Sequence, residues 1–199
     1  MIKRGFDLIV ASLALVIVSP LLALIALAII VESRGPILHR ATRIGRDQKP
    51  FVLLKLRSMR VDAATTGPGI TASGDNRVTR VGRVLRRFKL DELPQLWNVV
   101  RGDMSIVGPR PEDPRYLANY SPQQLTLMRW RPGITSPASV TYRDEERVLT
   151  DAVAHGVDLE TAYLDVQAAK LGIELDYFPK STLRSDIGWI FRTVAAIAH

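Results

Sequence analysis

The strongest hydrophobic pattern in the chain is an uninterrupted apolar stretch near its start. Residues 8–31 carry no formal charge; Lys3 and Arg4 precede them, and Glu32 and Arg34 follow. As a straight helix this stretch would extend about 36 Å, enough to cross a hydrocarbon core about 30 Å thick. A cleaved signal peptide fits poorly, because the stretch is too long and no small-residue cleavage site follows it. The pattern predicts a membrane helix, with a buried helix of a soluble protein as the alternative.

Ser19 and Pro20 lie near the middle of this helix. Pro20 has no backbone N–H, so the carbonyl of Val16 loses its helical partner, and the Ser19 hydroxyl can donate to Val16 or Leu15 instead. The pair predicts a supported kink. A kinked helix can cross the membrane, or it can bend and return to the same face with halves about 18 Å long. Basic residues on both sides leave these two topologies open.

After the apolar stretch the pattern changes to short strands and loops. Residues 37–43 and 51–59 predict two strands, and the polar segment 45–50 between them predicts a hairpin. Residues 62–76 are rich in Ala, Thr, Gly, Asp and Asn and predict a loop. A second loop is predicted at 107–114, where Gly and Pro residues resist regular structure.

Helical patterns account for most of the remaining chain. Helices are predicted at 78–88, 91–100, 122–130, 144–171 with an interruption near Gly156, and 180–197. The last is either a core helix or an amphipathic helix on a bilayer surface. The expected class is α+β with helix predominating. The expected organisation is a membrane helix over residues 1–35 and one domain over 36–199.

Composition narrows the classes of partner. Lys and Arg number 27 against 20 Asp and Glu, a net charge of +7. This balance indicates an anionic partner: nucleic acid, an acidic lipid surface or a phosphate-rich substrate. The chain has no cysteine, which excludes disulfides and thiolate metal sites. Three scattered histidines, His39, His155 and His199, do not suggest a zinc site.

Asp91 and Glu92 are the first candidates for chemistry. Pro94 is tolerated only in the first turn of a helix, which places Asp91 near the N-cap of the helix predicted at 91–100. Carboxylates at a helix start lie in a positive field, so both are expected to be ionised. From this dipeptide alone, an ordinary acidic helix start is the commoner explanation.

Three cations change that assessment. Lys55, Arg86 and Arg110, the last between Pro109 and Pro111, stand near the carboxylates in the order of motifs along the chain. Fixed cations beside ionised carboxylates suit a phosphorylated substrate bound with a divalent metal. Taken separately, the same residues also fit a solvated basic face and a rigid turn.

The ordered set of motifs is more specific than any one of them. The set comprises the Ser19-Pro20 pair, Lys55-Leu56-Arg57-Ser58-Met59, Asp75-x-Arg77-x-Thr79-x-x-Gly82, Leu90-Asp91-Glu92-Leu93-Pro94-Gln95, the segment from Gly102 to Pro111, and Arg131-Pro132-Gly133-Ile134-Thr135. In this order the chain resembles the bacterial sugar transferases, specifically the small monotopic phosphoglycosyl transferases. The resemblance is close over residues 1–135 and looser from Asp176-Tyr177 to Thr193.

The resemblance implies a reaction. A sugar 1-phosphate would pass from a nucleotide diphosphate sugar, usually a UDP-sugar, to a polyprenyl phosphate such as undecaprenyl phosphate. UMP would leave, and the product would start glycoconjugate or exopolysaccharide assembly. By this resemblance Asp91 is the nucleophile that forms a phosphosugar-aspartate intermediate, and Glu92 helps to hold Mg²⁺. Lys55 and Arg86 are expected to contact phosphate, and Arg110, with Pro109 and Pro111, to seat the nucleotide.

The resemblance also implies where the enzyme acts. The kinked helix would be re-entrant, with both ends at the cytoplasmic face of the bacterial plasma membrane and with amphipathic surface helices on lipid. Membrane lipids are then partners, nucleic acid is not, and a homodimer stays open. Two departures stand out: Phe88-Lys89 replaces small or hydroxylated residues of many relatives, and residues 136–146 lack a glycine-containing continuation. The sugar is therefore not named from the sequence.

A non-catalytic, membrane-anchored basic module that binds acidic lipid or nucleic acid is the rival interpretation. It accounts for the charge and the apolar stretch but not for the paired carboxylates. Exposed aromatic residues among the cations would favour it; the nearby ones, Phe51, Phe88 and Trp97, are expected to be buried. For topology, a helix that crosses the membrane ahead of the same catalytic domain is the alternative.

Overall fold

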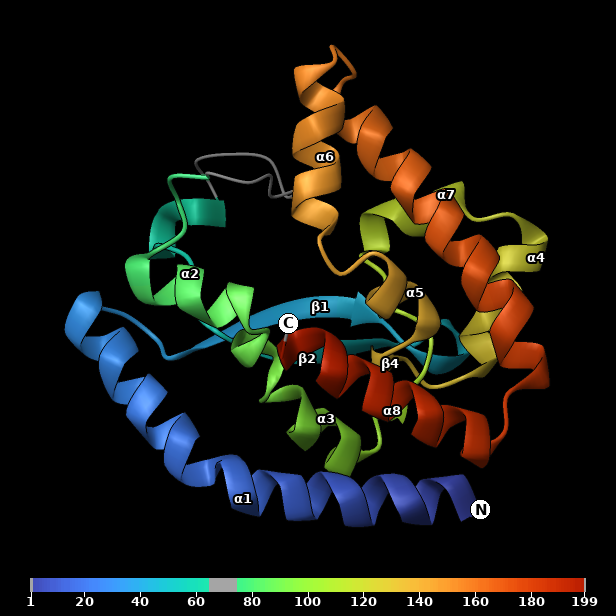
Figure 1. The fold of residues 1–199 in the computed structure, drawn as a ribbon, viewed down its shortest axis with the longest axis horizontal. Coiled ribbons are helices and arrows are strands. Elements are labelled where there is room, and N and C mark those ends of the chain that lie inside the picture. Colours follow the sequence, from blue (N-terminus) through green and yellow to red (C-terminus); the bar gives the residue numbers. More distant parts are fainter. Residues whose placement is uncertain (1, 65–74, 199) are drawn as a thin grey trace.

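The structure, a computed structural model, describes residues 2–64 and 75–198. Helices predominate and surround two small two-stranded sheets (Figure 1), which confirms the α+β class with helix predominating. The elements in chain order are α1 (Ile2–Glu32), β1 (Leu38–Ile44), β2 (Pro50–Leu56), α2 (Arg80–Arg87), α3 (Gln95–Arg101), β3 (Ser105–Val107), α4 (Pro122–Leu125), β4 (Gly133–Thr135), α5 (Pro137–Thr141), α6 (Glu145–Ala154), α7 (Leu159–Tyr177) and α8 (Leu183–Ala198).

The apolar stretch forms one helix, α1, with Pro20 inside it. The Ser19 hydroxyl donates to the Val16 carbonyl at 2.8 Å, one of the two bonds expected from the sequence. In Figure 1, α1 runs along the lower edge of the molecule and then turns toward α2. Large apolar side chains such as Ile17 (76% exposed) face outward. Within the described residues α1 alone is long and apolar enough to cross a membrane.

The first turns of α1 are fixed to the domain by charged side chains. Lys3 forms an ion pair with Asp186 of α8. Arg4 donates to the carbonyl of Val99 at 2.7 Å, which satisfies a carbonyl near the C-terminal end of α3. Asp7 is buried and accepts a hydrogen bond from Ser105 of β3 at 2.8 Å. Since these partners come from three elements, this end of α1 is part of the folded domain.

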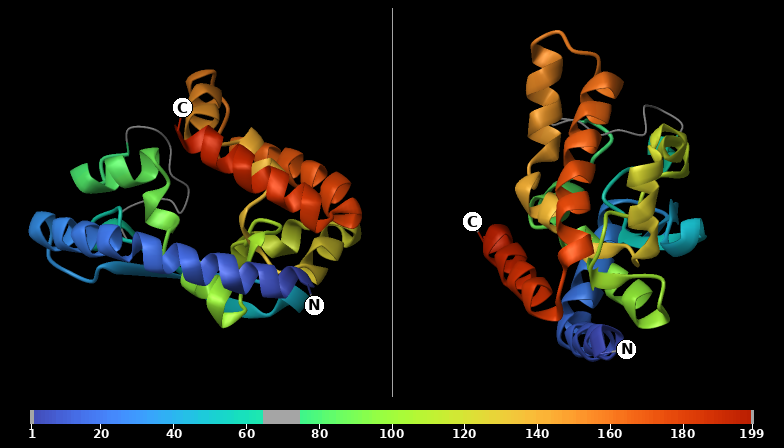
Figure 2. Two further views of the ribbon diagram at one scale, coloured as in Figure 1. Left: turned by 60° about the horizontal axis from the view of Figure 1, so that its bottom comes forward. Right: turned by 90° about the vertical axis from the view of Figure 1, so that its right-hand side faces the viewer.

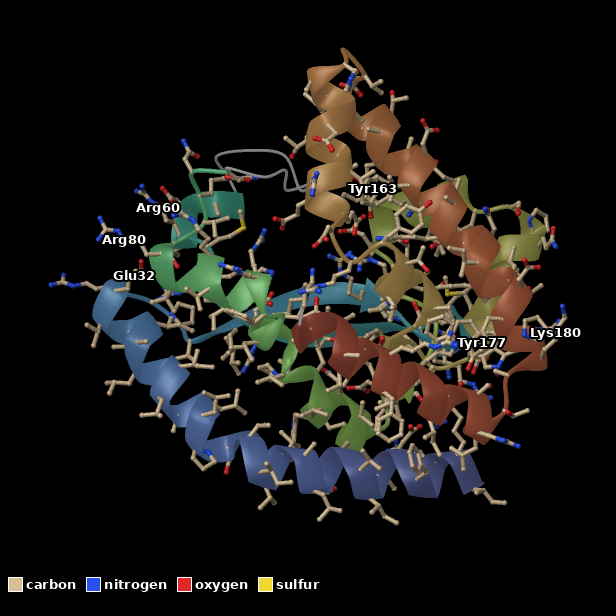
Figure 3. The ribbon with its side chains drawn as sticks, in the orientation of Figure 1. Glu32, Arg60, Arg80, Tyr163, Tyr177 and Lys180 are labelled. Carbon is tan, nitrogen blue, oxygen red and sulfur yellow. The ribbon has the colours of Figure 1, made fainter. Side chains whose placement is uncertain are left out.

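The last turn of α1 is fixed to the same domain by a second set of contacts. Glu32 accepts the backbone N–H groups of Arg80 and Val81 at 2.7 and 3.0 Å, and so caps α2; Glu32 and Arg80 are labelled in Figure 3. Buried Arg57 donates to the carbonyls of Ser33 and Arg34, each at 2.7 Å. Both ends of α1 therefore bind one domain, while the outward face between them is apolar.

The hairpin predicted after α1 is confirmed. β1 and β2 pair antiparallel, from Leu38 opposite Leu56 to Ile44 opposite Pro50. Asn98 of α3 is completely buried and joins the hairpin to the domain. Its side chain donates to the Val52 carbonyl at 2.7 Å and accepts the Leu54 N–H at 3.0 Å.

A second sheet was not predicted. β3 and β4 pair in parallel, so Val107, expected in a loop, ends a strand instead. A Cβ at Gly133 would lie 2.1 Å from the Gly108 nitrogen, so glycine is required for this close approach. Three-residue strands are too short to show alternation in sequence, which is why the pattern missed them.

Two predicted helices differ from the observed elements. The helix expected at 91–100 is instead a 3₁₀ turn over Leu90–Glu92 followed by α3, whose N-cap is Pro94. The placement of Asp91 at a regular N-cap is therefore wrong. Lys89 adopts a left-handed conformation (φ 53°) between α2 and this turn, so the chain changes direction there. The helix expected at 122–130 consists of α4 and a 3₁₀ turn over Thr126–Arg129.

The other helical predictions are confirmed. α2, α6, α7 and α8 lie where periodicity placed them, and Gly156 (φ +88°) lies in the break between α6 and α7. Of the loop predicted at 62–76, residues 65–74 lie outside the described part of the chain, and Val61–Ala64 forms a 3₁₀ turn. α8 buries Asp186 on its inner face and exposes Phe191 (71%) on its outer face, so one face of this helix packs on the domain, and a bilayer contact of the other face stays a prediction.

Side-chain packing divides the domain into a main core, an arm, and a smaller cluster in which Ile25 and Ile29 of α1 pack with Leu56 and Leu85. The main core joins α1, the hairpin, α3, β3 and α7 around residues such as Val99 and Met104. α6 and the first part of α7 pack on each other through Leu149, Ala162 and Val166. Figure 2 shows this pair of helices extending from the side of the molecule opposite α1. The segment that connects α5 to α6 therefore lies where the arm meets the main core.

Candidate active site

Asp91 lies in the 3₁₀ turn between α2 and α3, and only 7% of its surface is exposed. Its Oδ1 atom is buried without a hydrogen-bond partner among the described residues. Burial raises the pKa of Asp91 and the charge of Glu92 adds to this, while Lys55, Arg86 and Lys89 oppose it. The field of a regular helix start does not act on Asp91, because Asp91 lies in a separate 3₁₀ turn and burial raises its pKa. Neighbouring cations are what stabilise its charged form.

Glu92 is paired directly with a predicted site residue. Lys55 Nζ of β2 lies 2.7 Å from Glu92 Oε1, and both side chains are about one quarter exposed, at 27% and 26%. Burial alone would raise the pKa of Glu92, but the charge and hydrogen bond of Lys55, with further help from Arg110 and Lys89, lower it to about 2. Glu92 is thus ionised at neutral pH, as the sequence predicted.

Arg86, on the last turn of α2, is held by three groups. Its Nε donates to the Ser58 hydroxyl at 3.1 Å, its Nη1 to Glu146 at 2.7 Å and its Nη2 to the Met59 sulfur at 3.4 Å. Ser58 and Met59 belong to the Lys55–Met59 motif, so this motif orients Arg86 as well as supplying Lys55. The thioether is a weak acceptor, which leaves the Nη2 group available to an anion.

Arg110 lies on the loop after β3, and 45% of its side chain is exposed. Its Nη2 atom lies 4.0 Å from Glu145, which also pairs with Lys170. Pro109 on one side accepts the Gly133 N–H at 2.9 Å, and Pro111 on the other lines the adjacent cavity. The two prolines thus hold a loop that presents a half-exposed guanidinium.

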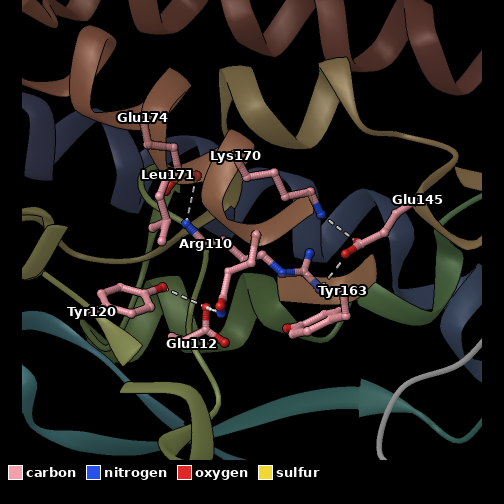
Figure 4. Close-up of a pocket in the computed structure, with 9 residues that line it drawn as sticks. Arg110, Glu112, Tyr120, Glu145, Tyr163, Lys170, Leu171 and Glu174 are labelled. Atoms are coloured by element: carbon pink, nitrogen blue, oxygen red, sulfur yellow. Dashed lines mark hydrogen bonds and ion pairs between the residues drawn. The ribbon is translucent and has the colours of Figure 1, made fainter. Parts of the chain in front are cut away.

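A buried polar cluster lies behind Arg110 (Figure 4). Glu174 of α7 is 1% exposed and accepts hydrogen bonds from the Arg110 backbone N–H at 3.1 Å and the Ser136 hydroxyl at 2.9 Å. Burial raises the pKa of Glu174 to about 7. Burial and the charge of Arg110 lower the pKa of Lys170 to about 8. Nearby, Glu112 accepts from Tyr120 at 2.7 Å.

Sequence reasoning did not identify this cluster. Its members are charged residues scattered from position 110 to position 174, and on helices such residues normally indicate a solvated face. In this sequence, only the tertiary structure brings them together.

A cavity of about 220 Å³ adjoins these groups. Of the predicted site residues, Lys55, Glu92, Arg110 and Pro111 line it, whereas Asp91, Arg86 and Pro109 do not. Its cationic lining comprises Arg43, Lys55, Lys89, Arg110, Arg143 and Lys170. Six cations against the two carboxylates Glu92 and Glu145 make this cavity suited to a multiply charged anion.

Two adjacent carboxylates, Asp91 and Glu92, are the candidate ligands for a divalent metal. The described residues contain no group of three or more His, Cys, Asp or Glu side chains that could hold one. Mg²⁺, however, binds through one or two carboxylates together with substrate phosphates and water. Glu92 and the unpartnered Oδ1 of Asp91 fit that requirement. These residues suit a metal that arrives with a phosphorylated substrate.

Comparison with known proteins identifies one family and several relatives of this chain. Residues 1–199 match the family described as "Bacterial sugar transferase". The chain is 39% identical over 200 residues to a UDP-glucose:undecaprenyl-phosphate glucose-1-phosphate transferase of Caulobacter vibrioides, which covers 98% of this chain and 69% of that protein. A protein of the same description from Escherichia coli is 37% identical over 199 residues, or 98% of this chain and 39% of the relative.

In a further relative, the match covers most of the length of both proteins. The exopolysaccharide production protein ExoY of Rhizobium meliloti is 32% identical over 212 residues, 99% of this chain and 85% of the relative. The chain therefore spans most of the length of some relatives and well under half of others.

Proposed function

Because this chain belongs to the bacterial sugar transferase family, we propose that it transfers a sugar 1-phosphate from a UDP-sugar to undecaprenyl phosphate. This phosphoglycosyl transfer would begin assembly of an exopolysaccharide or another glycoconjugate, in keeping with the names of its relatives. One observation carries the assignment of the site. The buried carboxylate of Asp91, whose Oδ1 has no hydrogen-bond partner among the described residues, adjoins the Lys55–Glu92 pair beside a cation-lined cavity.

In the proposed first step an oxygen of Asp91 attacks the phosphorus that carries the sugar. A bond forms between this oxygen and phosphorus, and the bond from phosphorus to the bridging oxygen breaks, so that its electron pair leaves with UMP. Two anions must approach each other in this step, so cations have to offset their repulsion. Lys55, Arg86 and Arg110 would do so on the donor diphosphate, with Pro109 and Pro111 fixing the nucleotide-side loop.

In the proposed second step the acceptor phosphate attacks the same phosphorus. A new phosphorus–oxygen bond forms, and the bond to Asp91 breaks and returns its electron pair to the carboxylate. The product carries the sugar on a diphosphate joined to the lipid. Burial raises the pKa of Asp91, which makes its anion a stronger nucleophile, while nearby cations favour the ionised form.

Mg²⁺ is proposed to bind at Glu92 and Asp91 together with the donor, where it would neutralise developing charge on the diphosphate. Glu92 suits this role because its carboxylate is ionised at neutral pH and one of its oxygens, Oε1, is already held by Lys55.

The site is proposed to act at the cytoplasmic face of the plasma membrane, with α1 as a re-entrant helix bent at Ser19-Pro20. Support comes from the two ends of α1, which are both bound to one domain, at Asp7 with Ser105 and at Glu32 with Arg80. A crossing helix would place its ends on opposite sides of the bilayer. The chain has no cysteine, so single cysteines at positions 2 and 35 can be labelled cleanly from each side. Labelling of both from the cytoplasm is expected; opposite sidedness would contradict the re-entrant form.

The central experiment uses Asp91→Asn. The amide cannot form the phosphosugar ester, so UMP release from UDP-sugars in the presence of Mg²⁺ and undecaprenyl phosphate should fall by at least about a thousandfold. Wild-type protein given radiolabelled donor alone should retain label, and Asp91→Asn should not. Asp151→Asn, an exposed aspartate of α6, serves as the matched control and should behave like wild type. A fully active Asp91→Asn enzyme would exclude Asp91 as the nucleophile.

One prediction that weighed against the basic-module interpretation is wrong. Phe88 and Trp97 are 42% and 50% exposed rather than buried, because α2 and α3 each turn one face outward. Arg87 lies over the Phe88 ring, with 5.5 Å from Cζ to the ring centroid. On this point the exposed aromatics favour the basic-module interpretation, although they do not exclude a transferase. Turnover distinguishes them, since a binding module would release no UMP from any donor.

A further inference from the structure

Lys89 and Arg143 differ from the other four cations that line the cavity. Arg43 pairs with Asp113, Lys55 with Glu92, and Arg110 and Lys170 with Glu145. Within the described part of the chain, the side chains of Lys89 and Arg143 form neither an ion pair nor a hydrogen bond. Two cations that line a cavity without a partner are free to bind an anionic ligand.

The backbone at Lys89 adds a second, independent observation. Lys89 has φ 53° and ψ 23°, a left-handed conformation that a lysine adopts only at a cost. Asparagine or glycine would be accommodated more easily, so the local fold does not explain why lysine stands here. This residue immediately precedes the turn with Asp91 and Glu92, and its charge acts on both carboxylates and on Glu145. Backbone strain of this kind occurs at functional sites, where the side chain takes part in binding or catalysis.

The apolar side chains that line the cavity indicate which kind of anion these two cations bind. Leu93 and Leu96 line it from α3 and the preceding turn, Val140 from α5 and Ile197 from α8. Apolar side chains of this kind suit an isoprenoid chain but contribute little to holding a nucleotide or a sugar. The cavity therefore offers an apolar wall and unpaired cations together, which matches a phosphate monoester on a hydrocarbon chain.

We propose that Lys89 and Arg143 bind the phosphate of the lipid acceptor, and that the apolar wall receives the beginning of its chain. The proposal rests on the proposed function and goes beyond it by separating two phosphate subsites. Lys55, Arg86 and Arg110 serve the donor diphosphate, and Lys89 and Arg143 serve the acceptor. Lys89 thus presents the attacking phosphate next to the residue that carries the sugar phosphate.

The test separates the two steps. Lys89→Asn removes the charge and retains a residue that tolerates the left-handed conformation, and Arg143→Gln removes the second charge. Each protein is loaded with radiolabelled UDP-sugar in the absence of acceptor, and the label retained is measured. Undecaprenyl phosphate in detergent micelles is then added, and the rate of label transfer to lipid is followed over a range of acceptor concentrations. Arg147→Ala removes an exposed arginine of α6 that does not line the cavity and is the matched control.

Loading of Arg143→Gln should match wild type, because the donor subsite is intact. Loading of Lys89→Asn is measured at the pH where it is maximal, because Lys89 also favours the charged form of Asp91. The acceptor concentration for half-maximal transfer should rise about tenfold in each single variant, the size expected for one lost charge-assisted contact, and further in the double variant. Lys89→Arg should recover most of the effect, and Arg147→Ala should behave like wild type.

Three results would overturn the inference. Transfer at wild-type rates and acceptor concentrations would show that these cations do not bind acceptor. Reduced loading of Arg143→Gln, or a raised KM for UDP-sugar in either variant, would assign these cations to the donor instead. An equal effect in Arg147→Ala would indicate a general influence of positive charge on micelle binding. If wild-type protein itself retained no label from any donor, the proposed function would fail rather than this inference.

Discussion

The Lys55 ammonium lies 2.7 Å from Glu92 Oε1, and this ion pair joins the hairpin to the turn that carries Asp91. Lys55 and Glu92 are 37 residues apart in sequence. Their ion pair therefore fixes the distance between two motifs that are neighbours only in the folded chain. It also explains how Glu92, next to the buried Asp91, stays ionised.

Lys55→Met tests this coupling. Without the ammonium, burial is no longer offset, so the pKa of Glu92 should rise from about 2. Glu92 would then take up a proton at higher pH. The pH at which activity falls on acidification should therefore rise by at least about one unit. Donor kcat/KM should also fall roughly tenfold to a hundredfold at neutral pH. The measurement is the pH–rate profile of donor loading, with Lys49→Met as the control for removing an exposed lysine. An unchanged acid limb would refute the coupling.

Glu174→Gln tests the buried carboxyl behind Arg110. A folded-state pKa raised from 4.5 to about 7 means that the folded protein keeps this proton where the unfolded chain has lost it. Stability is therefore fully present below about pH 4.5 and falls as the pH rises through 7, by about 3 kcal/mol in all. Glutamine does not titrate and can accept the same two hydrogen bonds. Chemical unfolding of both proteins from pH 5 to 8 should show this decrease in wild type alone; parallel curves would contradict the raised pKa.

Gly82→Ala should destabilise the protein strongly. A Cβ at Gly82 would lie 1.9 Å from the Ser58 carbonyl oxygen, a backbone atom that cannot turn away. α2 would have to move away from the Lys55–Met59 motif, which orients Arg86. The free energy of unfolding is therefore expected to fall by roughly 2–4 kcal/mol, and activity should fall with it. Gly188→Ala is the control, because a Cβ there meets nothing within 4 Å and alanine favours the α8 helix. Thermal unfolding of the two variants should move in opposite directions, and equal effects would argue against the close approach.

Arg57→Leu should loosen the end of α1 from the domain. Arg57 is 6% exposed and donates to carbonyls of Ser33 and Arg34, so its removal leaves buried acceptors without donors. The free energy of unfolding should fall by about 2–4 kcal/mol. Arg60→Leu removes a side chain that is 67% exposed and should change stability by less than about 0.5 kcal/mol. Similar losses of stability in both proteins would show that the removed positive charge, and not the hydrogen bonds from Arg57 to Ser33 and Arg34, determines the change.

Local patterns were enough for the elements that depend on neighbouring residues. The length of the apolar stretch predicted α1, and Gly156 marked the break between α6 and α7. Ser19 and Pro20 predicted a bond from the Ser19 hydroxyl to Val16 or Leu15, of which the structure has the first. Each of these features depends on backbone chemistry within a few positions. The motif order was equally informative, since it pointed to the family that residues 1–199 match.

The conformation around Asp91 shows where local rules stop. Pro94 and the two acids predicted a helix start with ionised carboxylates, yet the chain forms a separate 3₁₀ turn and buries Asp91. The same holds for the exposure of Trp97 and for the parallel pair β3 and β4, whose partners are about 30 residues apart. Burial and strand pairing depend on neighbours that are distant in sequence, which no local window contains.

By itself, the sequence determined the long apolar helix α1, the hairpin, the helical character and the motifs that identify the family, because periodicity and motif order are properties of neighbouring residues. Only the tertiary structure decided that Asp91 has an unpartnered oxygen, that Arg110 is backed by Glu174, and that Lys89 and Arg143 line one cavity without ion-pair partners within the described residues. The physical reason is that burial and charge pairing are set by side chains that meet in space, and these come from segments far apart along the chain.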